Sequence, residues 1–382
     1  MILHLLPEIL KKTFLFHVLL ILTFVISGTC MLPLMMITSF CLWKYNRSLY
    51  HKIIYHLCYV IWCQFTFIAQ WWGKLKIRLY IEDENVKYLG SENALIIMNH
   101  KYDIDWLIGW QMAEQYGCLG GTIPFVKESL KHIPILGWIW RYNGAIFLKR
   151  DWTKDKLTIS NSSNDLDDFP HNYQKLLLLY PEGTRFTDEK LKSSNKIALS
   201  KNMKPLVNCL LPRAKGFIEI VHAIRNNVKV IYDLTLAFPI SENNENAEAT
   251  MSNVLNCNLE EAHLLFRRYV IEDLPLHSDE ELAQWLYMLF YQKDSDFNYF
   301  LQYGNFQQSS SFVIKKRFTD MVVAESLHLA VISLLFYFIK AFVLNCSWNI
   351  IIIFIFCIGL CLLIVYLMIR ITKTETGSAY GK

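Results

Sequence analysis

The chain has 382 residues, of which 53% are hydrophobic and 19% charged, with a formal net charge of +4 at pH 7. The charged share is below the roughly 25% of an ordinary soluble protein, and the net charge is too small to indicate a nucleic-acid partner. Composition therefore indicates a membrane protein that carries one globular domain. The ten cysteines form no CxxC pair and no metal-like spacing with histidine, so we expect no metal and a globular part that is cytosolic and reduced.

The N-terminal region contains two apolar segments. Residues 14–40 include no Asp, Glu, Lys or Arg, and about 20 apolar residues are enough to span a bilayer. A second uncharged run, residues 53–72, ends in two tryptophans and precedes basic residues at 74, 76 and 78, as at a cytoplasmic membrane interface. If both runs spanned, the basic residues between them would lie in a short lumenal loop, against the positive-inside tendency. We therefore expect one span and one interfacial helix.

Residues from about 75 to 300 alternate short apolar runs with amphipathic segments. This alternation is typical of an α/β domain with a mostly parallel sheet flanked by helices. The predicted strands are residues 77–81, 94–98, 123–126, 145–148, 176–180, 206–210 and 228–237. The predicted helices are residues 104–116, 153–167, 188–203, 214–225 and 278–290. Two polar stretches, 161–168 and 241–258, are expected to be surface loops.

The C-terminal region predicts a transmembrane hairpin. Residues 326–344 are apolar and follow the basic stretch 315–317, and a second apolar run, 348–369, precedes Arg370. Basic residues on both outer flanks, with none at the break, place both ends on the cytosolic side. We therefore expect an N-terminal membrane-anchoring region (1–74), a cytosolic α/β domain (75–310) and a transmembrane hairpin with a short tail (311–382).

The sequence NHKYDID, residues 99–105, contains a candidate catalytic pair. His100 and Asp105 lie where the predicted strand 94–98 ends and the helix 104–116 begins, and ligands bind at the carboxyl ends of such strands. The carboxylate could hold one ring nitrogen and leave the other to take a proton from a hydroxyl. Because no serine accompanies the pair, we expect the substrate to supply the hydroxyl. The alternative is a capping histidine beside a surface carboxylate; Asp103 is expected to cap the helix.

The sequence PEGTR, residues 181–185, is a candidate phosphate site at the end of strand 176–180. Gly183 lets the backbone approach a ligand closely, Thr184 donates a hydrogen bond, and Arg185 offers a planar fork to phosphate oxygens. Glu182 could orient Arg185 or a neighbouring loop. The alternative is a strand-to-helix turn with a surface arginine.

Two further basic stretches follow predicted strands. Strand 145–148 is followed by Lys149 and Arg150; Arg150 is the better anion ligand, and Phe147 is expected to pack. The alternative there is a solvated basic pair. Pro212 lies in the basic loop LPRAKG before helix 214–225, and the amino terminus of that helix could also meet an anion.

Four motifs occur in one order: NHxxxxD, GxxFxxR, EGTR and LPRxKG, at residues 99–105, 144–150, 182–185 and 211–216. With membrane runs on both sides, they resemble the glycerolipid acyltransferase family that acylates 1-acylglycerol-3-phosphate, and most of all its animal gamma/delta-type enzymes. The resemblance extends over roughly residues 15–300 and implies the glycerolipid acyltransferase fold.

The resemblance implies transfer of a fatty acyl group from acyl-CoA to the sn-2 hydroxyl of lysophosphatidic acid, giving phosphatidic acid and CoA. Acyl-CoA is then a co-substrate, no other cofactor is expected, and membrane lipids are partners. The implied location is the endoplasmic reticulum membrane, with a cytosolic catalytic domain and the Golgi as an alternative.

The resemblance also implies roles for individual residues. His100 would be the general base and Asp105 its orienting partner. The positions implied to bind the glycerophosphate acceptor are Phe147, Arg150, Glu182, Gly183, Thr184 and Arg185. Pro212 marks the fourth motif, which is linked in the family to the acyl-donor side.

Shared motifs leave three other functions open. The chain could acylate another lysophospholipid, of the lysophosphatidylinositol or lysocardiolipin type. It could be a non-catalytic membrane-shaping protein, in which His100 and Asp105 would not matter. It could also be a lipid hydrolase in which His100 activates water.

Overall fold

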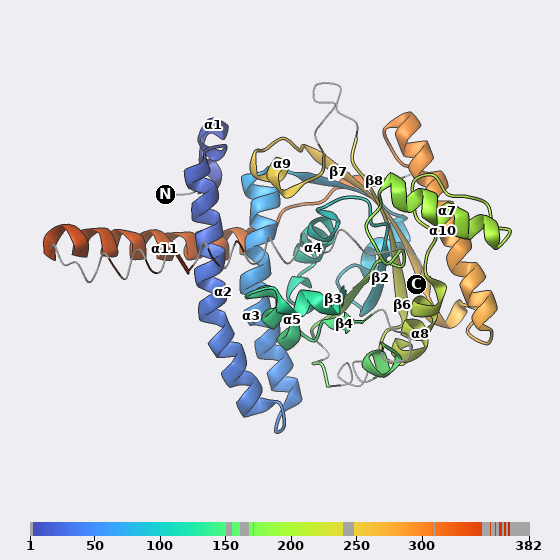
Figure 1. The fold of residues 1–382 in the computed structure, drawn as a ribbon, viewed down its shortest axis with the longest axis horizontal. Helices are drawn as coiled ribbons and strands as arrows, with labels where there is room; N and C mark the ends of the chain where they lie inside the picture. The colour runs from blue at the N-terminus through green and yellow to red at the C-terminus, as the bar shows by residue number, and fades with distance from the viewer. Residues whose placement is uncertain are drawn as a thin grey trace.

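A mixed eight-stranded sheet with helices packed around it forms the centre of the molecule (Figure 1). The computed structural model describes residues 3–345 except 150–154, 161–167, 171, 240–247 and 309, together with a few isolated positions as far as residue 366. The strands are β1 (Lys76–Tyr80), β2 (Ala94–Met98), β3 (Thr122–Lys127), β4 (Ile146–Leu148), β5 (Leu176–Leu179), β6 (Val230–Ala237), β7 (Glu261–Val270) and β8 (Ser311–Val313). The α-helices are α1 (Glu8–Lys11), α2 (Phe14–Leu42), α3 (Arg47–Phe67), α4 (Asp105–Gln115), α5 (Leu136–Asn143), α7 (Asp188–Ser200), α8 (Ala214–Ile224), α9 (Met251–Leu255), α10 (Asp279–Tyr303) and α11 (Phe318–Asn345).

The strand order across the sheet is β4-β3-β5-β2-β6-β7-β1-β8. Neighbours from β4 through β6 are parallel, β7 is antiparallel to β6 and parallel to β1, and β8 is antiparallel to β1. The expected mostly parallel sheet flanked by helices is confirmed. The carboxyl ends of parallel strands all lie on the same side of a sheet. The segments that follow β2, β3, β4 and β5 therefore begin next to one another.

Strand β2 lies in the middle of the sheet and is buried on both faces. Ile96 and Met98 belong to one core cluster with side chains of α4, whereas Leu95 and Ile97 belong to a second cluster with side chains of α8 and α10. A strand covered on both faces reads as a continuous apolar run rather than as an alternation, which is why ALIIM predicted β2 with the bounds that the structure has.

The strand predicted over residues 206–210 is wrong. In the structure, the carboxylate of Asp294 on α10 accepts hydrogen bonds from the backbone N–H groups of Val207, Asn208 and Cys209, at 3.0, 2.6 and 3.2 Å. These groups are then not available to a sheet ladder. The apolar run therefore forms a loop held by a side chain about 85 positions further along the chain.

Other segments differ from prediction in their extent. The helix predicted over 278–290 begins as expected but continues to Tyr303, and β7 and β8 were not predicted. Within the predicted helix 153–167, residues 155–160 are helical, and the remainder lies outside the described residues. The loop predicted over 161–168 lies almost wholly outside them, as does the first part of 241–258, whereas Met251–Leu255 forms α9.

Three helical segments, Phe14–Leu42, Arg47–Trp72 and Phe318–Ala341, are long and apolar enough to cross a membrane. The second joins α3 to a π-helical turn, Ile68–Trp72, and it is the most deeply packed of the three, with 61% of its most apolar window buried inside the protein. Helix α2 packs along α3, and α11 crosses both (Figure 1). The chain is therefore a membrane protein. One span plus one interfacial helix stays a prediction, and the second run of the C-terminal hairpin (348–369) lies almost wholly outside the described residues.

Candidate active site

His100 and Asp105 are in contact at the carboxyl end of β2. The Nδ1 atom of His100 lies 2.9 Å from Oδ2 of Asp105. Asp105 is the first residue of α4 and is fully buried, and its two carboxylate oxygens accept from the backbone N–H of Tyr102 at 3.1 and 3.2 Å. The carboxylate is thus held by the same turn that carries the histidine, so the ring orientation is set before any substrate arrives.

The environment keeps the imidazole neutral. Burial lowers the pKa of His100 to about 4; the carboxylate of Glu182 opposes this shift, and the positive charges of Arg185 and Lys190 add to it. Burial raises the pKa of Asp105 well above its usual value, while the backbone N–H groups of Tyr102 and Lys101 favour its charged form. When Nδ1 donates to Asp105, the other ring nitrogen, Nε2, is the basic atom. A neutral ring of this kind can accept a proton from a substrate hydroxyl at pH 7.

The ring of Tyr180 stacks on the ring of His100. Their centroids are 4.1 Å apart and their planes are inclined by 20°. Tyr180 follows β5, which pairs directly with β2, so the stack is a consequence of strand order. Sequence reasoning did not single out this tyrosine, and the available signal was its place immediately before PEGTR at the end of a buried strand.

Glu182 joins three loops of the site. It is buried, and its two carboxylate oxygens accept from the backbone N–H of His100 at 2.8 Å and of Leu210 at 3.0 Å. Burial raises the pKa of Glu182 to about 7, and these two N–H groups oppose that shift. The backbone N–H of Phe186 donates in turn to the carbonyl oxygen of His100 at 2.7 Å. Glu182 is therefore placed to orient the neighbouring loops, and its predicted contact with an acceptor stays a prediction.

Gly183 and Pro212 lie at the meeting of the PEGTR and LPRAKG loops. Gly183 has a φ of +71°, and a Cβ atom there would lie 2.8 Å from Nε of Arg213. The backbone N–H of Arg213, next to Pro212, donates to the carbonyl oxygen of Pro181 at 2.8 Å. A side chain at 183 would thus strain the turn and collide with the arginine, so the approach of the two loops requires glycine.

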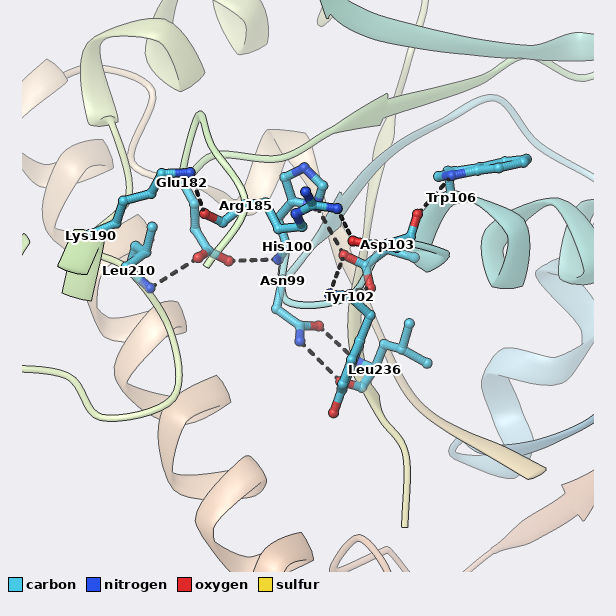
Figure 2. Close-up of polar contacts among 11 residues, drawn as sticks. Asn99, His100, Tyr102, Asp103, Trp106, Glu182, Arg185, Lys190, Leu210 and Leu236 are labelled. Carbon is cyan, nitrogen blue, oxygen red and sulfur yellow. Dashed lines mark hydrogen bonds and ion pairs between the residues drawn. The ribbon is translucent and has the colours of Figure 1, made fainter. Parts of the chain in front are cut away.

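Thr184 and Arg185, in the same turn, are contacted by charged side chains. Lys190, in the first turns of α7, donates from Nζ to Oγ1 of Thr184 at 2.8 Å and to the carbonyl oxygen of Arg185 at 3.0 Å. The guanidinium of Arg185 forms an ion pair with Asp103, and both side chains are roughly half exposed. The expectation that Asp103 caps helix α4 is wrong: the helix begins at Asp105, after Ile104, with no side-chain cap. Because the helix begins later than predicted, Asp103 lies in the turn before it, and its carboxylate pairs with Arg185 instead (Figure 2).

Phe147 is farther from the histidine than the PEGTR residues are. It lies on β4, opposite Val126 of β3, and β4 is three strands from β2, which is about 14 Å at the usual strand spacing. Arg150 lies outside the described residues. The roles predicted for both in acceptor binding stay predictions. Among the residues that the structure describes, no group of three or more His, Cys, Asp or Glu side chains is arranged to hold a metal ion.

Comparison with known proteins places this site in a family. The family description "Acyltransferase" matches residues 78–238, and "Acyltransferase C-terminus" matches residues 253–325. Human 1-acyl-sn-glycerol-3-phosphate acyltransferase delta is 33% identical over 383 residues, covering 98% of this chain and 97% of the relative. Human 1-acyl-sn-glycerol-3-phosphate acyltransferase gamma is 33% identical over 372 residues, covering 97% and 96%. Arabidopsis thaliana 1-acyl-sn-glycerol-3-phosphate acyltransferase 3 is 32% identical over 361 residues, covering 93% of each chain.

The fold and the site thus define an acyltransferase that is embedded in a membrane. More narrowly, the chain belongs to the 1-acyl-sn-glycerol-3-phosphate acyltransferase family.

Proposed function

We propose that this chain transfers a fatty acyl group from acyl-CoA to the sn-2 hydroxyl of 1-acylglycerol-3-phosphate, giving phosphatidic acid and CoA. The observation that carries the proposal is the contact of His100 Nδ1 with the buried Asp105 carboxylate at 2.9 Å, in a site where the positive charge of Arg185 also acts on the ring. The names of the relatives support the acceptor, because each is a 1-acyl-sn-glycerol-3-phosphate acyltransferase. No cofactor other than the acyl-CoA co-substrate is needed.

In the proposed mechanism, Nε2 of His100 takes the proton of the sn-2 hydroxyl while the oxygen attacks the thioester carbon. Asp105 stabilises the imidazolium that forms. The tetrahedral intermediate then collapses, the carbon–sulfur bond breaks, and the sulfur leaves with the proton from His100 as CoA thiol. Because the acceptor oxygen attacks directly, no covalent acyl-enzyme is required.

Arg185 is the proposed ligand of the acceptor phosphate. The positive charge of its guanidinium acts on His100, and the acceptor's phosphate is only a few bonds from the hydroxyl that reacts. A planar guanidinium binds phosphate oxygens in pairs. Lys190 contacts the same loop through Thr184 and adds positive charge there.

The membrane helices fit these substrates. Both lipid substrates partition into a bilayer, whereas the CoA moiety is water-soluble and anionic, so the enzyme must work at the interface. We propose a cytosolic catalytic domain on the endoplasmic reticulum membrane, with the Golgi as the alternative.

The test is acyl transfer in membranes that express the full chain. Labelled oleoyl-CoA is offered with a panel of lysophospholipids, to the wild type and to His100→Ala. The expected result is labelled phosphatidic acid from lysophosphatidic acid, with turnover reduced at least about a hundredfold in the variant. His222→Ala is the matched control, because His222 also contacts an aspartate, Asp279, at 3.0 Å, but on the surface between α8 and α10.

The outcomes separate the candidate functions. If another lysophospholipid is acylated in place of lysophosphatidic acid, the mechanism stands and the acceptor assignment fails. Hydrolysis of acyl-CoA without acceptor would indicate a lipid hydrolase. Absence of any acylation by well-expressed wild-type protein would favour a membrane-shaping protein.

A further inference from the structure

An acidic side chain already contacts the guanidinium that we assign to the acceptor phosphate. Nη1 of Arg185 is paired with Oδ1 of Asp103, and the two side chains are 41% and 48% exposed. The pair connects the segment after β2 to the segment after β5 (Figure 2), and Asp103 belongs to the turn that separates His100 from Asp105. A carboxylate and a phosphate would use the same donors of one arginine.

We infer that Asp103 is a specificity-determining residue, whose carboxylate competes with the acceptor's phosphate for Arg185 and so sets how much negative charge the acceptor site accepts. The inference rests on the proposed function, because it takes Arg185 as the phosphate ligand.

The fold allows the Asp103 carboxylate to give up its contact with Arg185. Helix α4 begins without a side-chain cap, so the Asp103 carboxylate is not required for the helix. An ion pair that is roughly half exposed contributes little free energy, because solvent screens it. The Asp103 backbone, by contrast, is fixed: its carbonyl oxygen accepts from Nε1 of Trp106 at 3.1 Å. An arriving phosphate can therefore displace the side chain without disturbing the turn that carries His100 and Asp105.

The displaced carboxylate stays within reach of the bound phosphate and repels it. A phosphomonoester has a second pKa of about 6 and carries nearly two negative charges at neutral pH, whereas a phosphodiester headgroup carries one. The repulsion scales with the product of the charges. Asp103 should therefore weaken the binding of lysophosphatidic acid more than that of a lysophospholipid with a phosphodiester headgroup.

The test uses Asp103→Asn, which keeps the shape of the side chain and removes its charge. The KM for lysophosphatidic acid and for lysophosphatidylinositol is measured in membranes containing the full chain, at fixed acyl-CoA and at low and high salt. We expect Asp103→Asn to lower the KM for lysophosphatidic acid by about 3–10-fold at low salt, and by less at high salt, because one nearby charge in a mostly aqueous setting has an effect of this size. A smaller decrease is expected for lysophosphatidylinositol.

The matched control is Glu272→Gln, which also removes one carboxylate from an exposed ion pair, with Lys229 at 3.4 Å. Glu272 follows β7. The last residues of β7 pair with the first residues of β6, which lie beside the start of β2 and so at the opposite end of the strands from His100. Its KM for lysophosphatidic acid should equal that of the wild type.

A second set of measurements, on Arg185→Ala with and without Asp103→Asn, separates this inference from the proposed function. Arg185→Ala should raise the KM for lysophosphatidic acid, and adding Asp103→Asn to it should lower the KM by less than in the wild type, because the two anions no longer share a ligand and only their direct repulsion remains. If Arg185→Ala leaves the KM unchanged, the phosphate role proposed for Arg185 fails. If Arg185→Ala raises the KM but Asp103→Asn leaves it unchanged or raises it, only the competition by Asp103 is overturned.

Discussion

The phenol ring of Tyr180 lies against the imidazole of His100, with the centroids 4.1 Å apart. The imidazole ring of His100 is thereby held on one face by Tyr180 and at Nδ1 by Asp105. An electron-rich aromatic face favours a cation over a neutral group, so the stack should stabilise the imidazolium that forms when His100 takes the proton.

Tyr180 can be tested by separating its ring from its hydroxyl. The hydroxyl is buried and has no hydrogen-bond partner among the described residues, so Tyr180→Phe should leave kcat close to the wild-type value. Tyr180→Leu removes the stack and should lower kcat by about 2–10-fold, the usual size of an aromatic pair. A kcat for Tyr180→Phe as low as that of Tyr180→Leu would show that the hydroxyl, not the ring, is what matters.

The pH dependence of turnover should follow the lowered pKa of His100. Burial lowers it from 6.5 to about 4, so the ring stays unprotonated, and able to act as a base, until the pH falls to about that value. We expect kcat at saturating acceptor to fall between about pH 5 and pH 3.5, rather than near 6.5. Saturation matters because the acceptor phosphate itself titrates near pH 6. A loss of kcat centred on 6.5 would contradict the lowered pKa of His100.

Glu182 should matter for stability as well as for activity. Glu182→Ala leaves the backbone N–H groups of His100 and Leu210 without their acceptor, and each buried group left unsatisfied costs about 1–3 kcal/mol. Thermal unfolding in detergent should shift to lower temperature, with Glu182→Gln intermediate because an amide oxygen can still accept. The control is Glu189→Ala on the exposed side of α7. If Glu182→Ala unfolds like the wild type and only its KM for acceptor rises, Glu182 is a ligand rather than a support for the loops.

A buried ion pair between helix α10 and strand β6 predicts a second effect on stability. Nζ of Lys293 on α10 lies 2.5 Å from Oδ1 of Asp233 on β6, and both side chains are fully buried. Among the described residues, Lys293→Met would leave the Asp233 carboxylate with Arg267 at 3.8 Å as its ion-pair partner, and loss of one partner of a buried pair costs about 3–5 kcal/mol. The double variant with Asp233→Asn should recover part of that loss, as measured by thermal unfolding. Equal stability of Lys293→Met and wild type would contradict a paired, charged Asp233.

The sequence by itself determined the elements and contacts that are local. ALIIM predicted β2 because a strand buried on both faces is continuously apolar, and the five-residue spacing of His100 and Asp105 predicted a contact that one turn can make. The class of fold followed from the alternation of apolar and amphipathic segments, and the membrane helices followed from the length of their uncharged runs. Each of these features depends on neighbouring residues, whose order is the sequence.

The tertiary structure decided which distant groups meet. Residues 206–210 are apolar enough for a strand, but Asp294 on α10 takes their N–H groups and makes them a loop. Asp103 resembles a helix cap, but β5 places Arg185 beside it, and the same strand sets Tyr180 on His100. Strand order brings β5 next to β2 although β3 and β4 lie between them in the chain. Hydrogen bonds and ion pairs of this kind depend on positions in space, which a pattern of neighbouring residues does not contain.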